Sequence, residues 1–255
     1  MKNEDAIARP GNWVRSLFKV NENTTARPRT WVRRFVKIVA RVSVTLMALF
    51  IVAHFGWRFS GSNKWEFVEE RNGVKVYTLK SPGSDLLQVK GIVRVRSTLR
   101  GLMSFLMDPK TTTDYGYTEQ RTIERVDDWL QYASFRLDLP FPFPTRTREF
   151  VTRSQIHQDL RTKEVLMIAA AAPEKAPPND CCFRVTEMNN TWRFTPLENG
   201  QIEIEYVNNT NMGGFIPNLL INTWKPKFMV EVLSKLQDLL DKKKSQDAKL
   251  DFIKE

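Results

Sequence analysis

The chain has 255 residues, enough for one large domain with an appendage or for two small domains, and its 42% hydrophobic and 27% charged residues exclude wholesale disorder. The net charge is +10, but residues 1–41 alone hold ten Lys/Arg against three Asp/Glu, so the remainder is almost balanced and lacks the basic face of a nucleic-acid-binding domain. Two histidines and two adjacent cysteines exclude most histidine-based metal sites, a four-cysteine zinc site and a disulfide framework, and we expect no metal and no other cofactor.

The opening segment, residues 1–37, is basic, and we expect it to be disordered or to lie on a membrane surface. It contains WVRSLFKV at 13–20, which is similar to WVRRFVKI at 31–38. Such a segment suits adsorption on anionic lipid, because its charges can contact the headgroups while its aromatic rings lie at the interface. A chance repeat in a basic leader explains the pattern equally well.

The next segment is apolar and predicts a transmembrane helix over residues 38–59. Residues 42–57 carry no formal charge and would span about 24 Å as a helix, against about 30 Å for the hydrocarbon core. Arg41 and Arg58 extend the usable span because their long side chains reach the headgroups. The alternative is a signal peptide, but forty-one residues precede the apolar run and no small-residue cleavage motif follows it. A single uncleaved span is the favoured prediction.

The basic residues on the two sides of this segment predict its orientation. Six Lys/Arg lie within residues 27–41, whereas only Arg58, Lys64 and Arg71 lie within a similar distance after the apolar run. Because positive residues are retained in the cytoplasm, the amino terminus is predicted to be cytoplasmic. The carboxy-terminal domain of this single-pass membrane protein would then lie on the extracytoplasmic side, in a periplasm or a lumen.

Residues 63–243 show the pattern of an antiparallel sheet closed by one long amphipathic helix, an α+β architecture. Alternation of apolar and polar residues predicts strands at 74–79, 87–96, 129–138, 148–154, 165–172, 181–187, 190–197 and 202–209. Helical spacing of apolar residues predicts a short helix at 99–107 and a long one at 217–241. The last residues, 244–255, are predicted to form a charged tail.

Four short motifs follow one another along this region. They are WE…NGVKVY at 65–77, PFPTRTREFV at 142–151, WRFTPL at 192–197 and GFIPNLLIN at 214–222. In order and spacing they resemble the motifs of START domains, the steroidogenic-acute-regulatory-protein-related lipid-transfer family, over residues 63–243. The chain departs from the family pattern at Glu149, where Asp is usual, and at Phe143, where Trp is frequent.

The resemblance implies a helix-grip fold, in which a curved antiparallel sheet wraps around the long carboxy-terminal helix and encloses a tunnel for one lipid or sterol-like molecule. The strands and the helix supply apolar side chains that suit such a lining. The candidate ligand-cavity residues are Phe135, Met167, Ala169, Phe183, Ile204, Tyr206, Phe228, Met229 and Val232. For most of them taken singly, ordinary core packing is the better explanation, although the small side chains at 169–172 favour unfilled volume.

Two sets of residues concern the loops around the tunnel. Gly213, Gly214 and Pro217 precede the long helix and are candidates for a hinge that gates entry. The adjacent pair Arg148 and Glu149, part of the family motif, is expected to hold the proline-rich connection or a neighbouring loop rather than to catalyse.

The cysteines and histidines offer little for catalysis. Cys181 and Cys182 are predicted to lie on opposite faces of a strand, where mutual pairing would be strained, and so to remain thiols. His157 has no cysteine nucleophile nearby, and the chain has no nucleophile-elbow motif. We therefore do not expect an enzyme.

The prediction is a membrane-tethered lipid-binding or lipid-transfer domain whose partners are a lipid or sterol-like ligand and a membrane, and not nucleic acid. Two alternatives stay open. A helix-grip enzyme, such as a cyclase, would act on an apolar substrate in the same cavity and would need convergent polar groups deep inside it. A regulatory domain would have a packed interior instead of a cavity. The sequence does not predict the oligomeric state.

Overall fold

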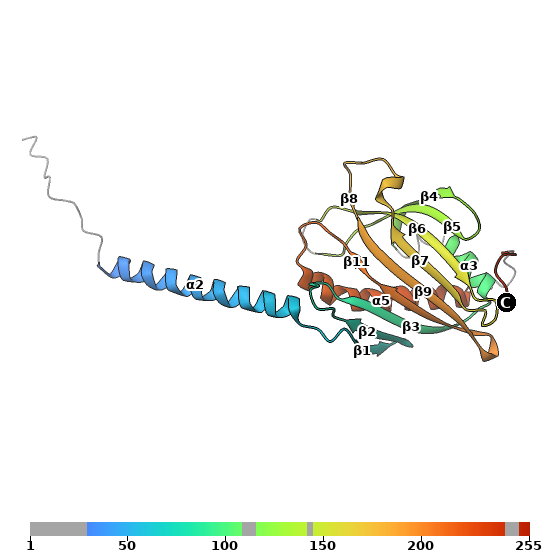
Figure 1. Ribbon diagram of the computed structural model, residues 1–255, viewed down its shortest axis with the longest axis horizontal. Coiled ribbons are helices and arrows are strands. Elements are labelled where there is room, and N and C mark those ends of the chain that lie inside the picture. Colours follow the sequence, from blue (N-terminus) through green and yellow to red (C-terminus); the bar gives the residue numbers. More distant parts are fainter. Residues whose placement is uncertain (1–29, 109–115, 142–144, 243–249) are drawn as a thin grey trace, which may run out of the picture. The chain divides into compact units, whose positions relative to one another are not determined.

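The structure is a computed structural model that describes residues 30–108, 116–141, 145–242 and 250–255 (Figure 1). The chain divides into two compact units, Met1–His54 and Phe55–Glu255. The motif at 13–20 and the prolines of the stretch 142–144 lie outside the described residues.

Helix α2 (Thr30–Phe59) contains the apolar segment near the amino terminus. Its most apolar window has a mean hydropathy of 2.2, and none of its residues is buried. At about 1.5 Å per residue the helix is about 45 Å long, which exceeds the roughly 30 Å of a hydrocarbon core. It begins before the predicted span because the basic residues from Arg33 to Lys37 are also helical. The helix is long and apolar enough to cross a membrane, and a signal sequence would share these properties.

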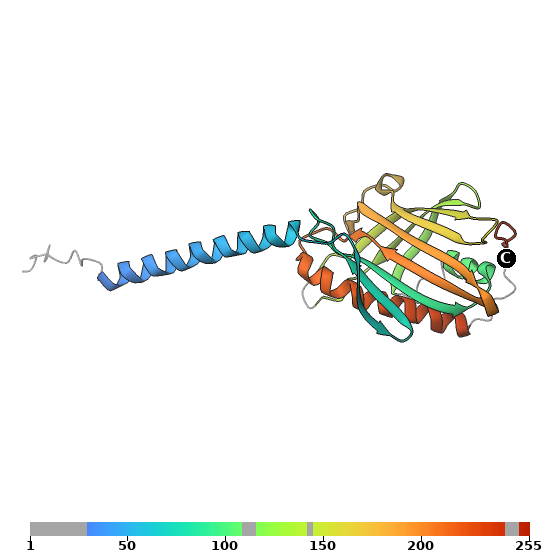
Figure 2. The same ribbon diagram turned by 60° about the horizontal axis from the view of Figure 1, so that its bottom comes forward.

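Within the described residues, the second unit is built on one sheet of eleven strands (Figures 1 and 2). The main path is β1-β2-β3-β10-β9-β7-β6-β5-β4, all antiparallel, with β11 beside β9 and β8 parallel beside β6. The strands are β1 (Trp65–Arg71), β2 (Val74–Leu79), β3 (Gln88–Arg96), β4 (Tyr117–Arg125), β5 (Leu130–Leu137), β6 (Arg148–Gln158), β7 (Val165–Ala171), β8 (Phe183–Arg184), β9 (Glu187–Leu197), β10 (Gln201–Asn208) and β11 (Thr210–Asn211). Because β10 pairs with both β3 and β9, it joins the amino-terminal strands to the rest of the sheet.

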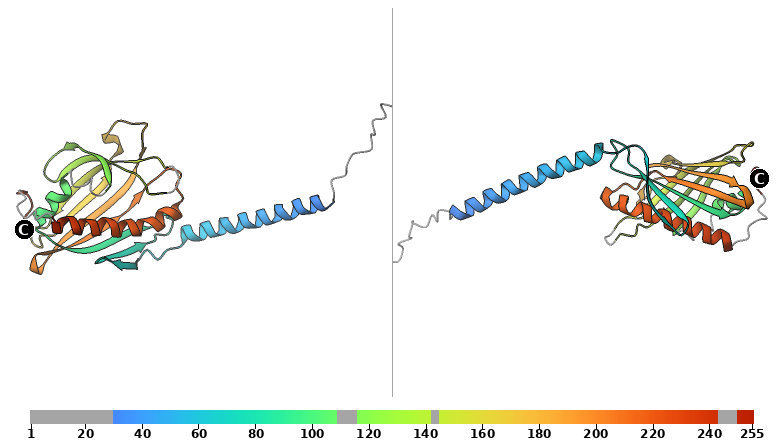
Figure 3. Two further views of the ribbon diagram at one scale, coloured as in Figure 1. Left: turned by 180° about the vertical axis from the view of Figure 1, so that it is seen from behind. Right: turned by 90° about the horizontal axis from the view of Figure 1, so that it is seen from below.

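The long helix α5 (Asn218–Lys242) packs across the sheet, mainly on β3 and β2 (Figures 2 and 3). Its buried side chains are Ile221, Met229, Val230, Val232, Leu233, Leu236 and Leu240, together with the polar Asn222 and Lys225. On β3, every second residue is buried, and Gly91 stands in that inward row. A Cβ at Gly91 would lie 2.5 Å from Leu233 Cδ1 and 2.7 Å from Met229 Cγ, so glycine permits the close contact of helix and sheet. The predicted α+β helix-grip fold with an amino-terminal apolar helix is confirmed.

The last described segment, residues 250–255, packs onto the short helix α3 (Leu99–Met107) and differs from the predicted charged tail. Ile253 is fully buried in the core. The Glu255 carboxylate accepts hydrogen bonds from the backbone N–H groups of Leu99 (3.0 Å) and Arg100 (2.9 Å). It thereby satisfies donors that have no partner inside a helix. Leu250, Phe252 and Ile253 are apolar, but so short a segment has no helical or strand period that predicts this packing.

Two strands and one boundary differ from the sequence prediction. β1 and β4 were not predicted, because WEFVEER and YTEQRTIER expose most of their side chains and lack a regular apolar alternation. The strand predicted at 181–187 is wrong, since β8 covers only Phe183–Arg184 and β9 begins at Glu187.

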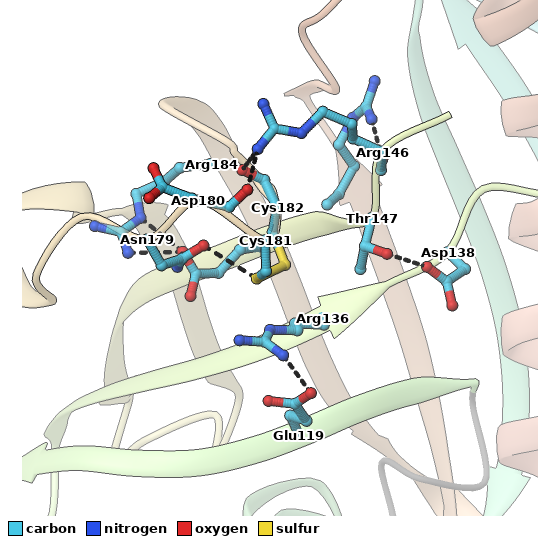
Figure 4. Close-up of a disulfide and its surroundings, with 12 residues drawn as sticks. Glu119, Arg136, Asp138, Arg146, Thr147, Asn179, Asp180, Cys181, Cys182 and Arg184 are labelled. Carbon is cyan, nitrogen blue, oxygen red and sulfur yellow. Dashed lines mark hydrogen bonds and ion pairs between the residues drawn. A yellow bond between two sulfur atoms is a disulfide. The ribbon is translucent and has the colours of Figure 1, made fainter. Parts of the chain in front are cut away.

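Cys181 and Cys182 form a disulfide with each other, which corrects the prediction of two thiols (Figure 4). Their Cα atoms lie 3.7 Å apart in a bend that precedes β8. The prediction relied on the alternation of side chains along a strand, and that alternation does not apply outside β8. The disulfide therefore belongs to the loop that connects β7 to β8.

Candidate ligand cavity

A cavity of about 170 Å³ lies between the sheet and α5. Its wall is formed by residues of α3, of β4 to β7, of β9 to β11 and of α5. Most of these side chains are apolar, and none of the described wall residues is Asp, Glu, Lys or Arg. An apolar cavity with a few polar groups is the usual form of a small-molecule site.

Several residues that the sequence singled out lie on this wall. They are Phe135, Met167, Ala169, Tyr206, Phe228 and Val232. Ala169 of β7 pairs with Ser154 of β6 and with Asn190 of β9, and both of these neighbours also line the cavity. The small side chain of Ala169 leaves space between them unfilled.

The other three candidates lie elsewhere. Ile204 is fully buried and belongs to the main packed core. Met229 packs against Gly91 of β3. The Phe183 ring lies 5.1 Å from the guanidinium carbon of Arg148, beside the loop that precedes α5. Periodicity identifies residues that face inward, but it does not separate a packed core from a cavity wall.

The polar end of the cavity consists of Asn190, Tyr206, Asn208 and Thr210, from β9, β10 and β11. The amides of Asn190 and Asn208 donate hydrogen bonds to the Tyr206 hydroxyl, at 3.2 and 3.0 Å. The Thr210 hydroxyl donates to Asn190 Oδ1 at 3.0 Å. Burial raises the pKa of Tyr206 to about 12, so the phenol stays protonated at neutral pH.

Tyr206 is one of the cavity residues predicted from the sequence, whereas its polar neighbours Asn190, Asn208 and Thr210 were not predicted. On β10, Ile202, Ile204, Tyr206 and Asn208 occupy the same buried face. Along that face the residues change from aliphatic to polar. This change could have predicted the polar cluster, because buried polar groups need hydrogen-bond partners.

Stacked aromatic rings form part of the wall. Trp192 stacks on Tyr206 with 3.8 Å between ring centroids and 12° between planes. Phe135 stacks on Phe150 with centroids 4.8 Å apart. Such rings present flat apolar surface with few rotatable bonds, which suits contact with a hydrocarbon ligand.

The loop before α5 contains the predicted hinge residues Gly213, Gly214 and Pro217. Both glycines have positive φ, +58° and +72°, where other residues are strained. The buried Arg148 fastens this loop, because its guanidinium donates to Met212 O at 2.8 Å and to Gly213 O at 3.0 Å. Burial lowers the pKa of Arg148, and the neighbouring positive charge of Arg146 lowers it further. Opening of the hinge would require these hydrogen bonds to break.

Glu149 fastens a second loop. Its carboxylate accepts from Arg184 Nη2 and Asn179 Nδ2, each at 2.6 Å. Arg184 also donates to the backbone oxygens of Ala176 and Pro177, at 2.6 and 2.7 Å. The ion pair of Glu149 and Arg184 therefore holds the loop that carries the disulfide. Arg146 also holds this loop, because its guanidinium donates a hydrogen bond to Asp180 O (Figure 4).

A buried lysine lies where α5 meets the polar end. Lys225 is 3% exposed, and its ammonium donates to Thr210 O at 2.8 Å and to Leu87 O at 3.2 Å. Burial lowers its pKa to about 8. Lys225 thereby links α5 to β11 and to Leu87, the residue that precedes β3.

Comparison with known proteins settles the family. The sequence profile of the START domain matches residues 58–245, which is most of the chain. The chain belongs to the START domain family. One relative, the uncharacterized protein PA1579 of Pseudomonas aeruginosa, is 23% identical over 209 residues, covering 80% of this chain and 98% of the relative.

Solved structures share the fold of this START protein. The STAR-related lipid transfer protein of Xanthomonas axonopodis (fragment 25–204) is 20% identical with a TM-score of 0.64, covering 69% of this chain and 98% of that one. Human StAR-related lipid transfer protein 5 is 18% identical with a TM-score of 0.61, covering 81% of this chain and 98% of that one. The resemblance inferred from the motifs is confirmed.

Proposed function

We propose that this START protein binds one lipid molecule in the cavity between the sheet and α5 and carries or stores it without covalent chemistry. The observation that carries the proposal is the cavity itself, with aromatic and aliphatic walls and one polar end, inside a START domain. The polar end offers no general acid or base near neutrality, since its titratable member is Tyr206, with a pKa of about 12. A cyclase-like reaction in the same cavity therefore has less support.

Entry of a lipid would require the domain to open. The cavity of about 170 Å³ is close to the roughly 150 Å³ of an engineered cavity that binds benzene, and below the roughly 300–1,000 Å³ of typical ligand sites. The loop around Gly213 and Gly214 is the natural hinge, since glycines there adopt positive φ without strain. Release of Arg148 from this loop would let the start of α5 move and enlarge the space.

We further propose that α2 anchors the domain on the extracytoplasmic face of a membrane. The six basic residues within 27–41 favour a cytoplasmic amino terminus. The disulfide of Cys181 and Cys182 supports the same orientation, because disulfides persist in oxidising compartments such as a periplasm or a lumen. A tethered domain stays near the bilayer, which raises the effective concentration of donor lipid.

The Ala169→Trp variant tests whether the cavity takes lipid. Ala169 lies on the wall in β7, so the indole would occupy space that is empty in the structure. We expect binding of a fluorescent phospholipid or sterol analogue to be lost while the thermal unfolding midpoint changes little. In a packed interior the same substitution would cost about 1–3 kcal/mol or more.

Leu236→Ala is the control for ordinary core packing. Leu236 is fully buried in the main core and is not part of the cavity wall. Its truncation should cost about 2–5 kcal/mol of stability whether or not a ligand binds. If Ala169→Trp unfolds the domain and the parent protein binds no lipid, the proposal fails and a packed regulatory domain remains.

A further inference from the structure

The last turn of α2 belongs to the second unit and is bonded there to the loop between β2 and β3. The Lys80 ammonium donates to Arg58 O at 3.2 Å and lies 5.2 Å from the centroid of the Trp57 ring. The Arg58 guanidinium forms an ion pair with the Asp85 carboxylate at 3.1 Å. Because a cation is favourable at the carboxyl end of a helix, Lys80 helps to fix the end of α2 on this loop.

The same loop also holds the first turns of α5. The Asn222 side chain accepts from the Leu87 N–H and donates to Asp85 O, both at 2.9 Å. Asp85 O accepts in addition from the indole N–H of Trp57, at 3.4 Å. Asp85 therefore bonds to the end of α2 and to the start of α5. The last turn of α2 thus lies at the hinge end of the domain, where the loop 213–217 leads into α5.

Two large apolar side chains are exposed at the hinge end. Phe215 is fully exposed in the hinge loop, and Leu219 is 73% exposed at the start of α5. Pro217, which lies between them in the sequence, is exposed as well. Apolar side chains lower the free energy of the system when they leave water, so a phenylalanine and a leucine in this position favour an apolar partner.

A hollow beside Phe215 adds positive charge to the hinge end. It encloses about 520 Å³, and its described wall includes Arg146 and Arg148 but no Asp or Glu. The exposed Arg146 uses Nη2 for the backbone oxygens of Asp180 and Cys182, and among the described residues its Nε and Nη1 donate to none. Guanidinium groups bind phosphate oxygens well, and phospholipid headgroups present such oxygens.

Resting on the proposed anchoring by α2, we infer that the bilayer that α2 crosses also binds the hinge end of the domain. Phe215 and Leu219 would insert at the boundary of headgroups and acyl chains, and Arg146 would contact a lipid phosphate. Trp57 is typical of the membrane interface, and its bond to Asp85 keeps the hinge end close to that interface. The loop proposed to open for a lipid would then face the bilayer, so that the lipid need not cross water.

Fluorescence quenching on the full chain in nanodiscs of phosphatidylcholine and phosphatidylglycerol tests this inference. A bimane label is attached to Asn218→Cys, an exposed position next to Leu219, and nitroxides on the lipid acyl chains quench it at close range. The native cysteines are paired in the disulfide, so the introduced thiol is the one that reacts. We expect the quenching at this position to be several-fold stronger than at Leu160→Cys. Leu160 is also exposed, but it follows the far end of β6, which runs about 33 Å from Arg148.

Leu49→Cys, within α2, separates this inference from the proposed anchoring. If its label is quenched while the label at Asn218→Cys is not, the bilayer does not cover the hinge end and the inference is overturned. If the label at Leu49→Cys is not quenched either, α2 does not cross the bilayer and the proposed anchoring fails.

Phe215→Ser combined with Leu219→Ser tests the apolar contact itself. Without these side chains, the quenching at Asn218→Cys should fall to the level at Leu160→Cys. Val126→Ser combined with Leu160→Ser is the matched control, because both residues are exposed and apolar but lie away from the hinge. Quenching that survives the first pair of substitutions would contradict insertion of Phe215 and Leu219.

Lys80→Met tests the bonds between α2 and the loop. This variant should lower the quenching at Asn218→Cys, because it removes the ammonium that holds the end of α2. Lys64→Met is the matched control, since Lys64 is an exposed residue of the linker and its loss changes the charge equally. Equal quenching in the two variants would show that the junction does not hold the hinge end at the bilayer.

Discussion

At the scale of single residues, Lys225 carries a charge into a region that the fold shields from water. Its ammonium gains hydrogen bonds to Leu87 O and Thr210 O in place of its hydration. The loss of hydration is the larger effect, because burial lowers the pKa of Lys225 from 10.5 to about 8. At pH values between about 8 and 10.5, Lys225 is mostly protonated in the unfolded chain but mostly deprotonated in the folded domain.

The free energy of unfolding should therefore rise with pH over this interval. From about pH 8 to about pH 10 the contribution of Lys225 is about 2 kcal/mol. Above about pH 10 the raised pKa of Tyr206 acts in the opposite direction, because the unfolded chain ionises first. Urea unfolding of the parent protein and of Lys225→Met at several pH values measures the effect. The variant should lose most of the rise, and parallel pH profiles would contradict this account.

Single residues also show which part of the ligand cavity can be predicted from the sequence. Alternation along β7 places Met167 and Ala169 on an inward face, and the structure puts both on the cavity wall. Ile204 faces inward by the same rule but lies in the packed core. The difference depends on where α5 lies against the sheet, which is a long-range property. The pairing of Tyr206 with Asn190 likewise depends on the neighbouring position of β9 and β10, which no local pattern encodes.

At the scale of elements, the loop between β11 and α5 is the hinge proposed to open the cavity. A Cβ at Gly214 would lie 2.9 Å from the Arg148 guanidinium, and the backbone there has φ of +72°. We expect Gly214→Ala to push Arg148 away from its carbonyl partners and to speed the release of a bound fluorescent lipid several-fold, measured by stopped-flow dilution into acceptor vesicles.

Gly200→Ala is the matched control for this change. Gly200 also has positive φ, +68°, but a Cβ there would meet nothing within 4 Å. Both variants carry a similar backbone strain of about 1–2 kcal/mol, whereas only Gly214→Ala disturbs Arg148. Equal release rates in the two variants would show that Arg148 does not control the loop.

Helices and strands whose apolar residues recur with a regular period could be predicted from the sequence, and those without such a period could not. The long helix α5 and the alternating strands β3 and β10 follow from apolar periodicity, and the structure has them within one or two residues of the predicted ends. Most side chains of β4 are exposed, and its sequence has no regular alternation of apolar and polar residues that would predict a strand. The segment before β8 looked like a strand because it continues into Phe183–Arg184, but the chain bends at the cysteine pair instead.

At the scale of the whole molecule, the proposed anchoring by α2 would hold the START domain on one side of a membrane, and that side would decide which lipid pool the domain can reach. The basic residues within 27–41 and the disulfide both favour the extracytoplasmic side. An alkaline phosphatase fused after Glu255 should therefore be active, whereas a reporter that functions only in the cytoplasm should be silent at the same position. The opposite pair of results would reverse the proposed topology.

The central claim is that the cavity between the sheet and α5 holds one lipid molecule. Native mass spectrometry of the full chain, purified from membranes in a mild detergent, measures this most directly. We predict a species that carries one co-purified lipid per chain, with organic extraction releasing that lipid for identification. The same species should be absent from Ala169→Trp, whose indole would fill the cavity. A parent protein free of lipid, or an equal lipid load on both proteins, would contradict the claim.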